Sequence, residues 1–298
     1  MKIAAFPKCY LEDISEGRLS LFRWIEMAQA LGADGLELYS GFLESTDSDY
    51  LGEVRAAIQQ AGFAMPMFCC SPDFTNPDAD LREQEFRRAC ERIRICRELG
   101  GPRSVCRVLS GQRYPQVALD VGVAWVVTAL QRLIPIAREH EVVLGLENHY
   151  KDGYWQFPEF AQKQEVFLAI VDAIEEREYF GVQYDPSNAI VAGDDPLELL
   201  RHVAPRVVSM HASDRYLAEG VTLAELQQAD GTLGYSPHLR HGVTGQGLND
   251  YDAIFSNLAA VGYQGWVSIE DGMNGMDEMK ASIDFLKEKR AQYFAATS

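Results

Sequence analysis

The chain has 298 residues, and its 44 Asp and Glu outnumber its 27 Lys and Arg to give a formal charge of −17. With 47% hydrophobic and 24% charged residues, the composition excludes wholesale disorder. The acidic balance argues against a nucleic-acid partner, because phosphate backbones are bound by clustered Lys and Arg. No apolar run reaches the length of a membrane span, and Pro7 and nearby charges interrupt the first residues too early for a secretory signal. We therefore expect a cytoplasmic protein without a membrane partner.

The six cysteines do not form a pattern typical of disulfides or of zinc sites. None belongs to a CxxC pair, and several lie in apolar stretches such as MPMFCCS. A cysteine in such a stretch usually behaves as a small buried hydrophobic residue. We therefore predict free thiols, and neither a disulfide framework nor a structural zinc site.

Short apolar runs alternate with longer amphipathic segments along the whole chain. The runs are typical of strands buried on both faces of a parallel sheet, and the segments between them have helical periodicity. The predicted strands are 2–6, 35–39, 63–71, 104–110, 142–149, 180–185, 206–213 and 265–271. The predicted helices are 20–31, 49–61, 80–99, 117–140, 165–177, 196–203, 250–261 and 277–294.

Eight strands and eight helices in strict alternation indicate a parallel α/β fold, and this number of units predicts a closed (β/α)8 TIM barrel. The alternative is an open doubly wound sheet, which often carries a glycine-rich phosphate loop after its first strand. The segment FPKCYLEDISEG has no GxGxxG, and no GxxxxGK[ST] motif occurs elsewhere. No linker-like stretch divides the chain, so we predict a single barrel domain over residues 1–298.

Two predicted connections are much longer than ordinary turns. They follow predicted strands five and seven and span residues 150–164 and 214–249. Loops of more than about 12–15 residues are usually functional or disordered, and these two are rich in aromatic residues and histidine, which disordered linkers rarely contain. Since both follow strands, we expect them at the C-terminal face of the barrel, where TIM barrels carry their active sites.

Four predicted strands end in polar residues of the kinds that bind metals. Glu147, Asp185, His211 and Glu270 belong to predicted strands five to eight. The C-terminal ends of barrel strands meet at one mouth, where three carboxylates without neighbouring lysines would repel one another. One divalent cation would remove this repulsion, and the oxygen-rich set suits Mn²⁺ best, with Mg²⁺, Co²⁺ or Zn²⁺ as alternatives. The other interpretation is that each residue separately caps the helix after its strand.

Several motifs around these residues resemble those of xylose-isomerase-like TIM barrels, a family that includes sugar-phosphate isomerases and ketose 3-epimerases. The resemblance covers nearly the whole chain, and its most specific parts are LGLENH, YDPSN, SMHASDR and GVTGQGLNDYDAIFSNLAAVGYQGWVSIED. It implies that Glu147, Asp185, His211 and Glu270 are the ligands of the metal ion. It also implies that Glu147 and Glu270 are catalytic acid and base groups on opposite faces of the substrate.

This residue set suits the isomerisation or epimerisation of a sugar. Either reaction removes a proton from a carbon next to a carbonyl, and the negative oxygens of the resulting enediolate can be stabilised by a divalent metal ion. A carboxylate beside the metal can remove the proton and return it. We therefore predict a metal-dependent sugar isomerase or epimerase of carbohydrate metabolism, with a small sugar or polyol as its substrate.

Three further residues are candidate substrate ligands by their positions. His149 lies two residues after Glu147 and should face the same mouth. By the resemblance, Arg215 occupies the position of an arginine that holds a substrate hydroxyl, and a salt bridge with Asp214 is the alternative. Glu37 ends the second predicted strand, where it could contact a sugar hydroxyl or pair with a nearby Lys or Arg.

A fourth candidate substrate ligand, Asn188, departs from the family pattern. Many family members carry a His three residues after the aspartate of strand six, and Asn188 takes that place here. An amide can hydrogen-bond a substrate hydroxyl but cannot titrate near neutral pH. Two other reactions that begin with the same proton abstraction therefore stay open: dehydration of a keto-sugar or keto-inositol, and lyase cleavage of a keto-glycoside.

Two more alternatives have less support. The DNA-repair AP endonuclease branch of this superfamily uses a multi-zinc site with several more histidines, whereas this chain has six in total. A non-catalytic sugar-binding subunit would not need all four metal-ligand residues. The aromatic-rich mouth loops leave a homo-oligomer open, since barrels often pack such loops against a second subunit.

Overall fold

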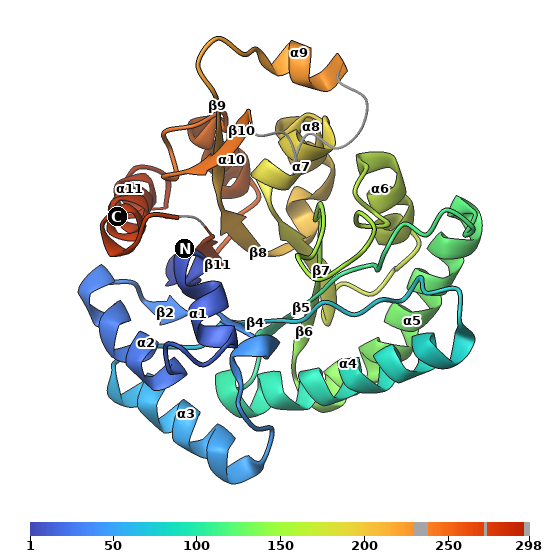
Figure 1. Cartoon of the computed structure of the whole chain (residues 1–298), viewed down its shortest axis with the longest axis horizontal. Coiled ribbons are helices and arrows are strands. Elements are labelled where there is room, and N and C mark those ends of the chain that lie inside the picture. Colours follow the sequence, from blue (N-terminus) through green and yellow to red (C-terminus); the bar gives the residue numbers. More distant parts are fainter. Residues whose placement is uncertain (229–237, 271–272, 295–298) are drawn as a thin grey trace.

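The computed structural model describes residues 1–228, 238–270 and 273–294. Its parallel strands curl into a barrel, and the helices lie outside it (Figure 1). The strands of the barrel are β1 (Lys2–Ala5), β2 (Gly35–Leu36), β3 (Leu38–Tyr39), β4 (Met67–Cys69), β5 (Val105–Val108), β6 (Val143–Glu147), β7 (Phe180–Tyr184), β8 (Val207–Ala212) and β11 (Trp266–Ile269). Their order around the barrel is β2-β1-β11-β8-β7-β6-β5-β4-β3.

The barrel closes at its second predicted strand, which is interrupted at Glu37. The first half of this strand, β2, pairs with β1, whereas the second half, β3, pairs with β4. Counting the two halves as one strand gives the eight parallel strands predicted from the alternation of apolar and amphipathic segments. The predicted TIM barrel is therefore confirmed.

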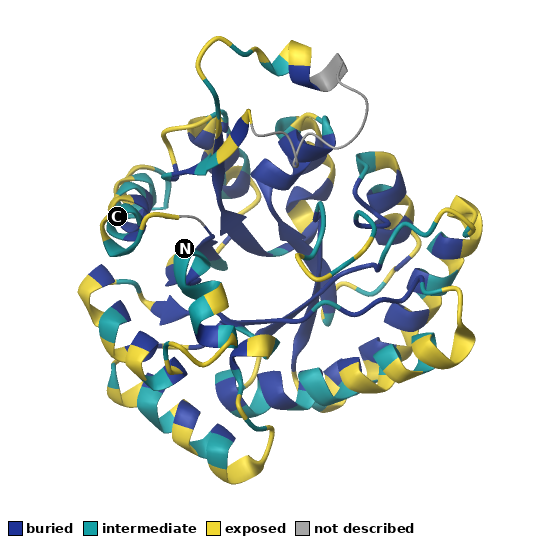
Figure 2. Ribbon diagram, in the orientation of Figure 1, coloured by how far each residue is buried: buried dark blue, intermediate teal, exposed yellow. Residues whose placement is uncertain are grey.

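The predicted helices are all present, and their ends lie within three residues of those expected, except that α6 ends at Asp172, five residues before its predicted end. They are α2 (Leu21–Ala28), α3 (Ser48–Gln60), α4 (Ala79–Gly100), α5 (Leu119–Glu139), α6 (Gln164–Asp172), α8 (Pro196–Val203), α10 (Tyr251–Ala260) and α11 (Met276–Tyr293). The helices turn buried faces toward the sheet and exposed faces outward (Figure 2). In α2, for example, the Ser20 side chain caps the first turn, and Trp24 and Ile25 are buried against the barrel.

One barrel helix, α5, is also long and apolar enough to cross a membrane by length and composition alone. A single helix of this kind is weak evidence for a span, because core helices have the same composition. In the barrel α5 packs between α4 and α6 and buries Val126, Leu130 and Leu133. These contacts are those of a barrel helix.

The connections contain short elements that periodicity does not predict. They are α1 (Leu11–Ser15), α7 (Pro186–Ala192), α9 (Leu223–Gln228), and a two-stranded hairpin formed by β9 (Asp214–Leu217) and β10 (Leu239–Gly242). The hairpin and α9 belong to the long connection after β8, of which residues 229–237 lie outside the described residues. The other long connection, after β6, is held against the connection after β5, since Gln112 Oε1 accepts hydrogen bonds from the backbone N–H groups of Gln156 and Phe157 (2.8 and 3.1 Å). Both connections leave the C-terminal end of the barrel, as predicted.

Candidate metal centre

The four residues predicted as metal ligands meet at the C-terminal end of the barrel. Glu147 is the last residue of β6, and His211 lies in β8. Asp185 and Glu270 directly follow β7 and β11. One ligand atom of each residue lies within 4.8 Å of those of the other three, and all four side chains are buried. We call these four residues the ligand group.

The His211 ring lies at the centre of the ligand group. Its Nδ1 lies 2.9 Å from Oε1 of Glu147, 3.4 Å from Oε2 of Glu270 and 3.9 Å from Oδ2 of Asp185. Three carboxylates therefore surround one ring nitrogen. Asp185 also caps α7, because its Oδ1 accepts a hydrogen bond from the backbone N–H of Asn188 (3.0 Å). This residue therefore fits both interpretations, as a metal ligand and as a helix cap.

The carboxylates of the ligand group repel one another when no cation lies between them. Burial, together with the charges of Glu270 and Glu147, raises the pKa of Asp185 to about 7. Without a metal, the ligand group would therefore retain a proton close to neutral pH. Metal ligands must be deprotonated, so a bound divalent ion would take the place of that proton.

Two cationic side chains contact the glutamates of the ligand group. Lys8 Nζ lies 2.8 Å from Oε1 of Glu270, and Arg107 Nε lies 2.9 Å from Oε2 of Glu147. Burial alone would raise the pKa of both carboxyl groups. However, Lys8 and His211 lower the pKa of Glu270, and His211 and Arg107 lower that of Glu147. Both glutamates are thus held in the ionised form, which can accept a proton.

The expectation that no lysine lies beside these carboxylates is wrong. Lys8 follows β1, and closure of the barrel pairs β1 with β11, the strand that precedes Glu270. Sequence reasoning missed this pair because it depends on the first and last strands being neighbours. One feature of the sequence could have indicated the pair. Lys8 follows the C-terminal end of the first predicted strand, just as the predicted ligands lie at the C-terminal ends of theirs.

The ligand group fits a divalent metal ion. Oε2 of Glu147 is buried and accepts no hydrogen bond from the described residues, even though Arg107 lies near it. Carboxylate oxygens combined with one imidazole nitrogen are a ligand set for Mn²⁺, Mg²⁺ or Zn²⁺. With a metal bound, Nδ1 of His211 would be the nitrogen ligand, so its ring proton would reside on Nε2.

A second set of residues contacts the opposite edge of the His211 ring. Oε1 of Glu37 lies 2.7 Å from Nε2, and the Cys69 thiol donates a hydrogen bond to the same oxygen (2.6 Å). Glu37, Cys69 and His211 are also close enough together to be considered as metal ligands. Burial raises the pKa of Cys69 to about 12, so without a metal the thiol is protonated and donates its hydrogen bond to Glu37.

We infer that Glu37 orients His211, because its Oε1 and the side-chain amide nitrogen of Gln183 (2.8 Å) both contact Nε2 of the ring. Its side chain is fully buried at the Nε2 edge of the ring, and its predicted contact with a sugar hydroxyl stays a prediction. Carboxylates in this place commonly orient a metal-binding histidine. The interruption between β2 and β3 places the residue there, which periodicity alone does not reveal.

Replacing Glu37 by Gln is expected to weaken metal binding without removing a ligand. The amide is not an anionic acceptor for the Nε2 proton, and loss of such a partner typically costs about 10- to 100-fold in metal affinity. Titration of metal-free protein with Mn²⁺ measures the change, with Glu44→Gln, at an exposed position, as the control. Equal affinities in the two variants would contradict the orienting role.

Two predicted substrate ligands lie next to Glu147. Asn188, in α7, donates a hydrogen bond from Nδ2 to Oε1 of Glu147 (3.3 Å). His149 lies two residues after Glu147, with Nδ1 3.8 Å from Oε2 of the buried Glu159. Burial opposes ionisation of His149, but the Glu147 charge and the Glu159 contact together raise its pKa above the ordinary value. Their contact with substrate stays a prediction.

Arg215 does not form the alternative salt bridge with Asp214. Its guanidinium lies over the Tyr150 ring, 5.4 Å from the centroid. The Asp214 carboxylate instead accepts hydrogen bonds from the backbone N–H groups of Gly247 and Asn249 (3.0 and 3.2 Å). Gly247 is required for this turn, since a Cβ there would lie 2.3 Å from the carbonyl oxygen of Arg215.

His241 is a residue of the site for which the sequence predicts no role. It lies opposite Arg215 in the β9–β10 hairpin. Burial and the charges of Arg215 and Lys8 lower its pKa to about 3, so the ring is neutral at physiological pH. The hairpin therefore adds one cation and one neutral imidazole to the same side of the mouth as Lys8.

Comparison with known proteins identifies the family. A family model described as "Xylose isomerase-like TIM barrel" matches residues 25–289. The chain belongs to this family. The match confirms the resemblance that the motifs indicate, and known members of the xylose isomerase-like family include epimerases, dehydratases and endonucleases.

Several solved structures share the fold at low sequence identity. A D-tagatose 3-epimerase-like protein is 16% identical with a TM-score of 0.75, and 99% of this chain and 98% of that chain are covered. D-psicose 3-epimerase from Clostridium cellulolyticum H10 is 14% identical with a TM-score of 0.72, and 97% and 98% are covered. The IOLI protein, whose structure contains a bound zinc atom, is 17% identical with a TM-score of 0.71, and 99% and 100% are covered.

Curated relatives match shorter segments. Rhizopine catabolism protein MocC of Rhizobium meliloti is 31% identical over 96 residues, which are 31% of this chain and 28% of MocC. Inosose dehydratase of Bacillus cereus is 28% identical over 114 residues, which are 36% and 37% of the two chains. Probable endonuclease 4 of Methanoculleus marisnigri is 26% identical over 186 residues, which are 59% and 62%. Each match thus spans less than two thirds of the relative.

Proposed function

We propose that this protein is a divalent-metal-dependent sugar isomerase or epimerase, which removes and returns a proton next to a carbonyl group. The observation that carries the proposal is the arrangement of Glu147 and Glu270. These ionised glutamates approach the same nitrogen of His211, and each is held by a cation of its own. A pair of proton-accepting carboxylates at a metal site is what reversible proton transfer at carbon requires.

Each residue of the ligand group would have a defined task. When bound, a divalent ion would stabilise the negative charge that develops on the substrate oxygens as the proton leaves carbon. Glu270, fixed by Lys8, would accept or return the proton on one face of the substrate, and Glu147, fixed by Arg107, would do so on the other. Asp185 and His211 would complete the ligand set, and we propose Mn²⁺ as the ion because most of the ligands are oxygens.

Small sugars or polyols are the proposed substrates. Solved structures with the same fold include a D-tagatose 3-epimerase-like protein and a D-psicose 3-epimerase. Arg215, Asn188 and His149 would hydrogen-bond substrate hydroxyl or carbonyl oxygens, since all three are buried polar side chains at the barrel mouth.

A dehydratase or lyase acting at the same site is the second candidate. Its reaction starts with the same proton abstraction, but it then expels a hydroxyl or alkoxyl group that must be protonated as it leaves. The position of His149, two residues from Glu147 and 3.8 Å from Oε2 of Glu159, favours this candidate, because an imidazole near Glu147 could supply that proton. The segment shared with inosose dehydratase also supports it.

An endonuclease function has less support than either. A relative named probable endonuclease 4 matches 59% of the chain. However, the chain has six histidines and a formal charge of −17, which opposes approach to a DNA backbone.

Incubation of ketoses and keto-inositols with the protein and Mn²⁺ in D₂O separates the two main candidates. Deuterium incorporation without loss of water supports an isomerase or epimerase. A deoxy or unsaturated product supports the dehydratase or lyase. Absence of any exchange across both substrate series, in protein shown to contain Mn²⁺, would contradict proton abstraction next to a carbonyl.

A further inference from the structure

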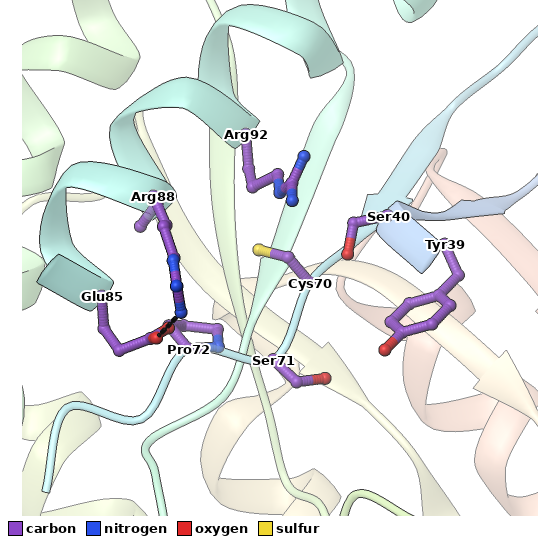
Figure 3. Close-up of a pocket in the computed structure, with 9 residues that line it drawn as sticks. Tyr39, Ser40, Cys70, Ser71, Pro72, Glu85, Arg88 and Arg92 are labelled. Atoms are coloured by element: carbon purple, nitrogen blue, oxygen red, sulfur yellow. Dashed lines mark hydrogen bonds and ion pairs between the residues drawn. The ribbon is translucent and has the colours of Figure 1, made fainter. Parts of the chain in front are cut away.

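A cavity lined by arginine lies beside the barrel mouth, outside the ligand group (Figure 3). It has a volume of about 260 Å³ and lies between α4 and the connections that follow β3 and β4. Ser40 and Ser71 come from these connections, and Cys70 directly follows β4. Arg88 and Arg92 come from one face of α4, four residues apart. We call this cavity the arginine cavity.

The two arginines differ in their partners. Arg88 is ion-paired with Glu85 (2.6 Å), which also lines the cavity. Arg92 is half-buried, and it forms no hydrogen bond or ion pair with the residues that the structure describes. The arginine cavity therefore contains one positive charge without a matching negative charge. Removing a guanidinium partly from water without an anionic partner is unfavourable, so a ligand that supplies the partner would bind.

The cavity lining adds a hydroxyl donor to this charge. In Figure 3 the side chains of Arg92, Ser40 and Cys70 turn toward the same space. A guanidinium presents planar N–H donors that match the oxygens of phosphate or carboxylate, and the Ser40 hydroxyl adds a single donor. The Cys70 thiol already donates to the carbonyl oxygen of Arg107 (3.2 Å). The cavity is slightly smaller than the roughly 300–1,000 Å³ of ordinary ligand pockets, which favours a small, highly charged group over a whole sugar ring.

The arginine cavity and the ligand group are connected through Arg107. Its Nη1 donates a hydrogen bond to the carbonyl oxygen of Cys70 (3.0 Å) and approaches Ser71 Oγ (3.4 Å). The Nε of the same side chain lies 2.9 Å from Oε2 of Glu147. The two sites share this one side chain, but their remaining residues are different.

We propose that the arginine cavity binds a phosphate-type oxyanion at Arg92, separately from the metal centre. The oxyanion is either inorganic phosphate or the phosphate group of a phosphorylated sugar. The proposal does not depend on the reaction proposed above, because its residues and its measurement are independent of the metal.

Calorimetric titration of the metal-free full chain with inorganic phosphate, at low ionic strength, tests the proposal. Removing the metal ensures that phosphate bound to a metal ion does not contribute. We expect saturable binding that weakens about tenfold or more in Arg92→Gln, because a charge-assisted hydrogen bond is lost. Arg87→Gln is the matched control, since Arg87 lies on the same helix, is largely exposed and does not line the cavity.

Chemical modification gives a second readout. Cys70 lines the arginine cavity, so bound phosphate should slow its alkylation by iodoacetamide, which peptide mass mapping detects. Glucose 6-phosphate tests the source of the oxyanion: tighter binding than inorganic phosphate assigns the cavity to a phosphate ester, and equal binding assigns it to free phosphate. Absence of saturable binding, or equal binding by wild type and Arg92→Gln, would overturn the proposal.

Discussion

Replacing His211 by Ala is expected to remove the metal ion and nearly all activity. His211 supplies the nitrogen of the ligand group, and without it three buried carboxylates face one another. Metal ions typically supply several kcal/mol of transition-state stabilisation, so turnover should fall by about 10³-fold or more. Metal content by mass spectrometry and turnover on the same preparation measure both effects.

A second histidine provides the control for this variant. His202, on α8, is exposed and lies 3.1 Å from Asp172, so His202→Ala should retain both metal and activity. Thermal unfolding of each variant shows whether it is folded, and His211→Gln offers a replacement of more similar size. A folded His211→Ala or His211→Gln protein that keeps its full metal content would refute the assignment of this ligand.

Glu270→Gln is expected to stop proton transfer on one face of the substrate. The amide preserves the shape and one oxygen of the side chain, but it does not accept a proton from carbon. General acid–base catalysis typically contributes about 10²–10⁴-fold, so exchange should slow by that factor. Deuterium exchange from D₂O into each of the two substrate epimers measures it. Glu147→Gln should stop exchange in the opposite epimer.

The experiment is interpretable only if both variants still bind the metal and if loss of a negative charge elsewhere in the protein does not slow exchange. Mn²⁺ content is therefore measured in each variant at saturating Mn²⁺. Glu288→Gln, at an exposed position of α11, makes the same chemical change away from the mouth and should exchange at the wild-type rate. If both Glu270→Gln and Glu147→Gln stop exchange in the same epimer, the glutamates do not act on opposite faces.

The barrel could be predicted because its strands are buried on both faces. Runs such as VVLGLE and FGVQYD are apolar throughout, and each is followed by a helical segment, which indicates a parallel sheet. The β9–β10 hairpin could not be predicted in the same way. Its strands have four residues each and include charged residues such as Asp214 and Arg240, so they lack the apolar run that marks the barrel strands.

The ligand group could be predicted because each ligand interrupts an apolar strand at the same end of the barrel. The supporting residues could not, because their roles depend on contacts between distant segments. Lys8 reaches Glu270 only because the barrel closes, and Glu37 contacts Nε2 of His211 because its strand is interrupted at that residue. Residue type and position predicted that Glu37 lies near the mouth, but they predicted neither the presence of Lys8 there nor which atoms the two side chains contact.

The most direct test of the metal centre is a crystal structure of the protein grown with Mn²⁺, with data collected where manganese scatters anomalously. We expect one anomalous peak, coordinated by the carboxylates of Glu147, Asp185 and Glu270 and by Nδ1 of His211. An anomalous peak at another position, or an ordered ligand group without a peak under saturating Mn²⁺, would contradict it.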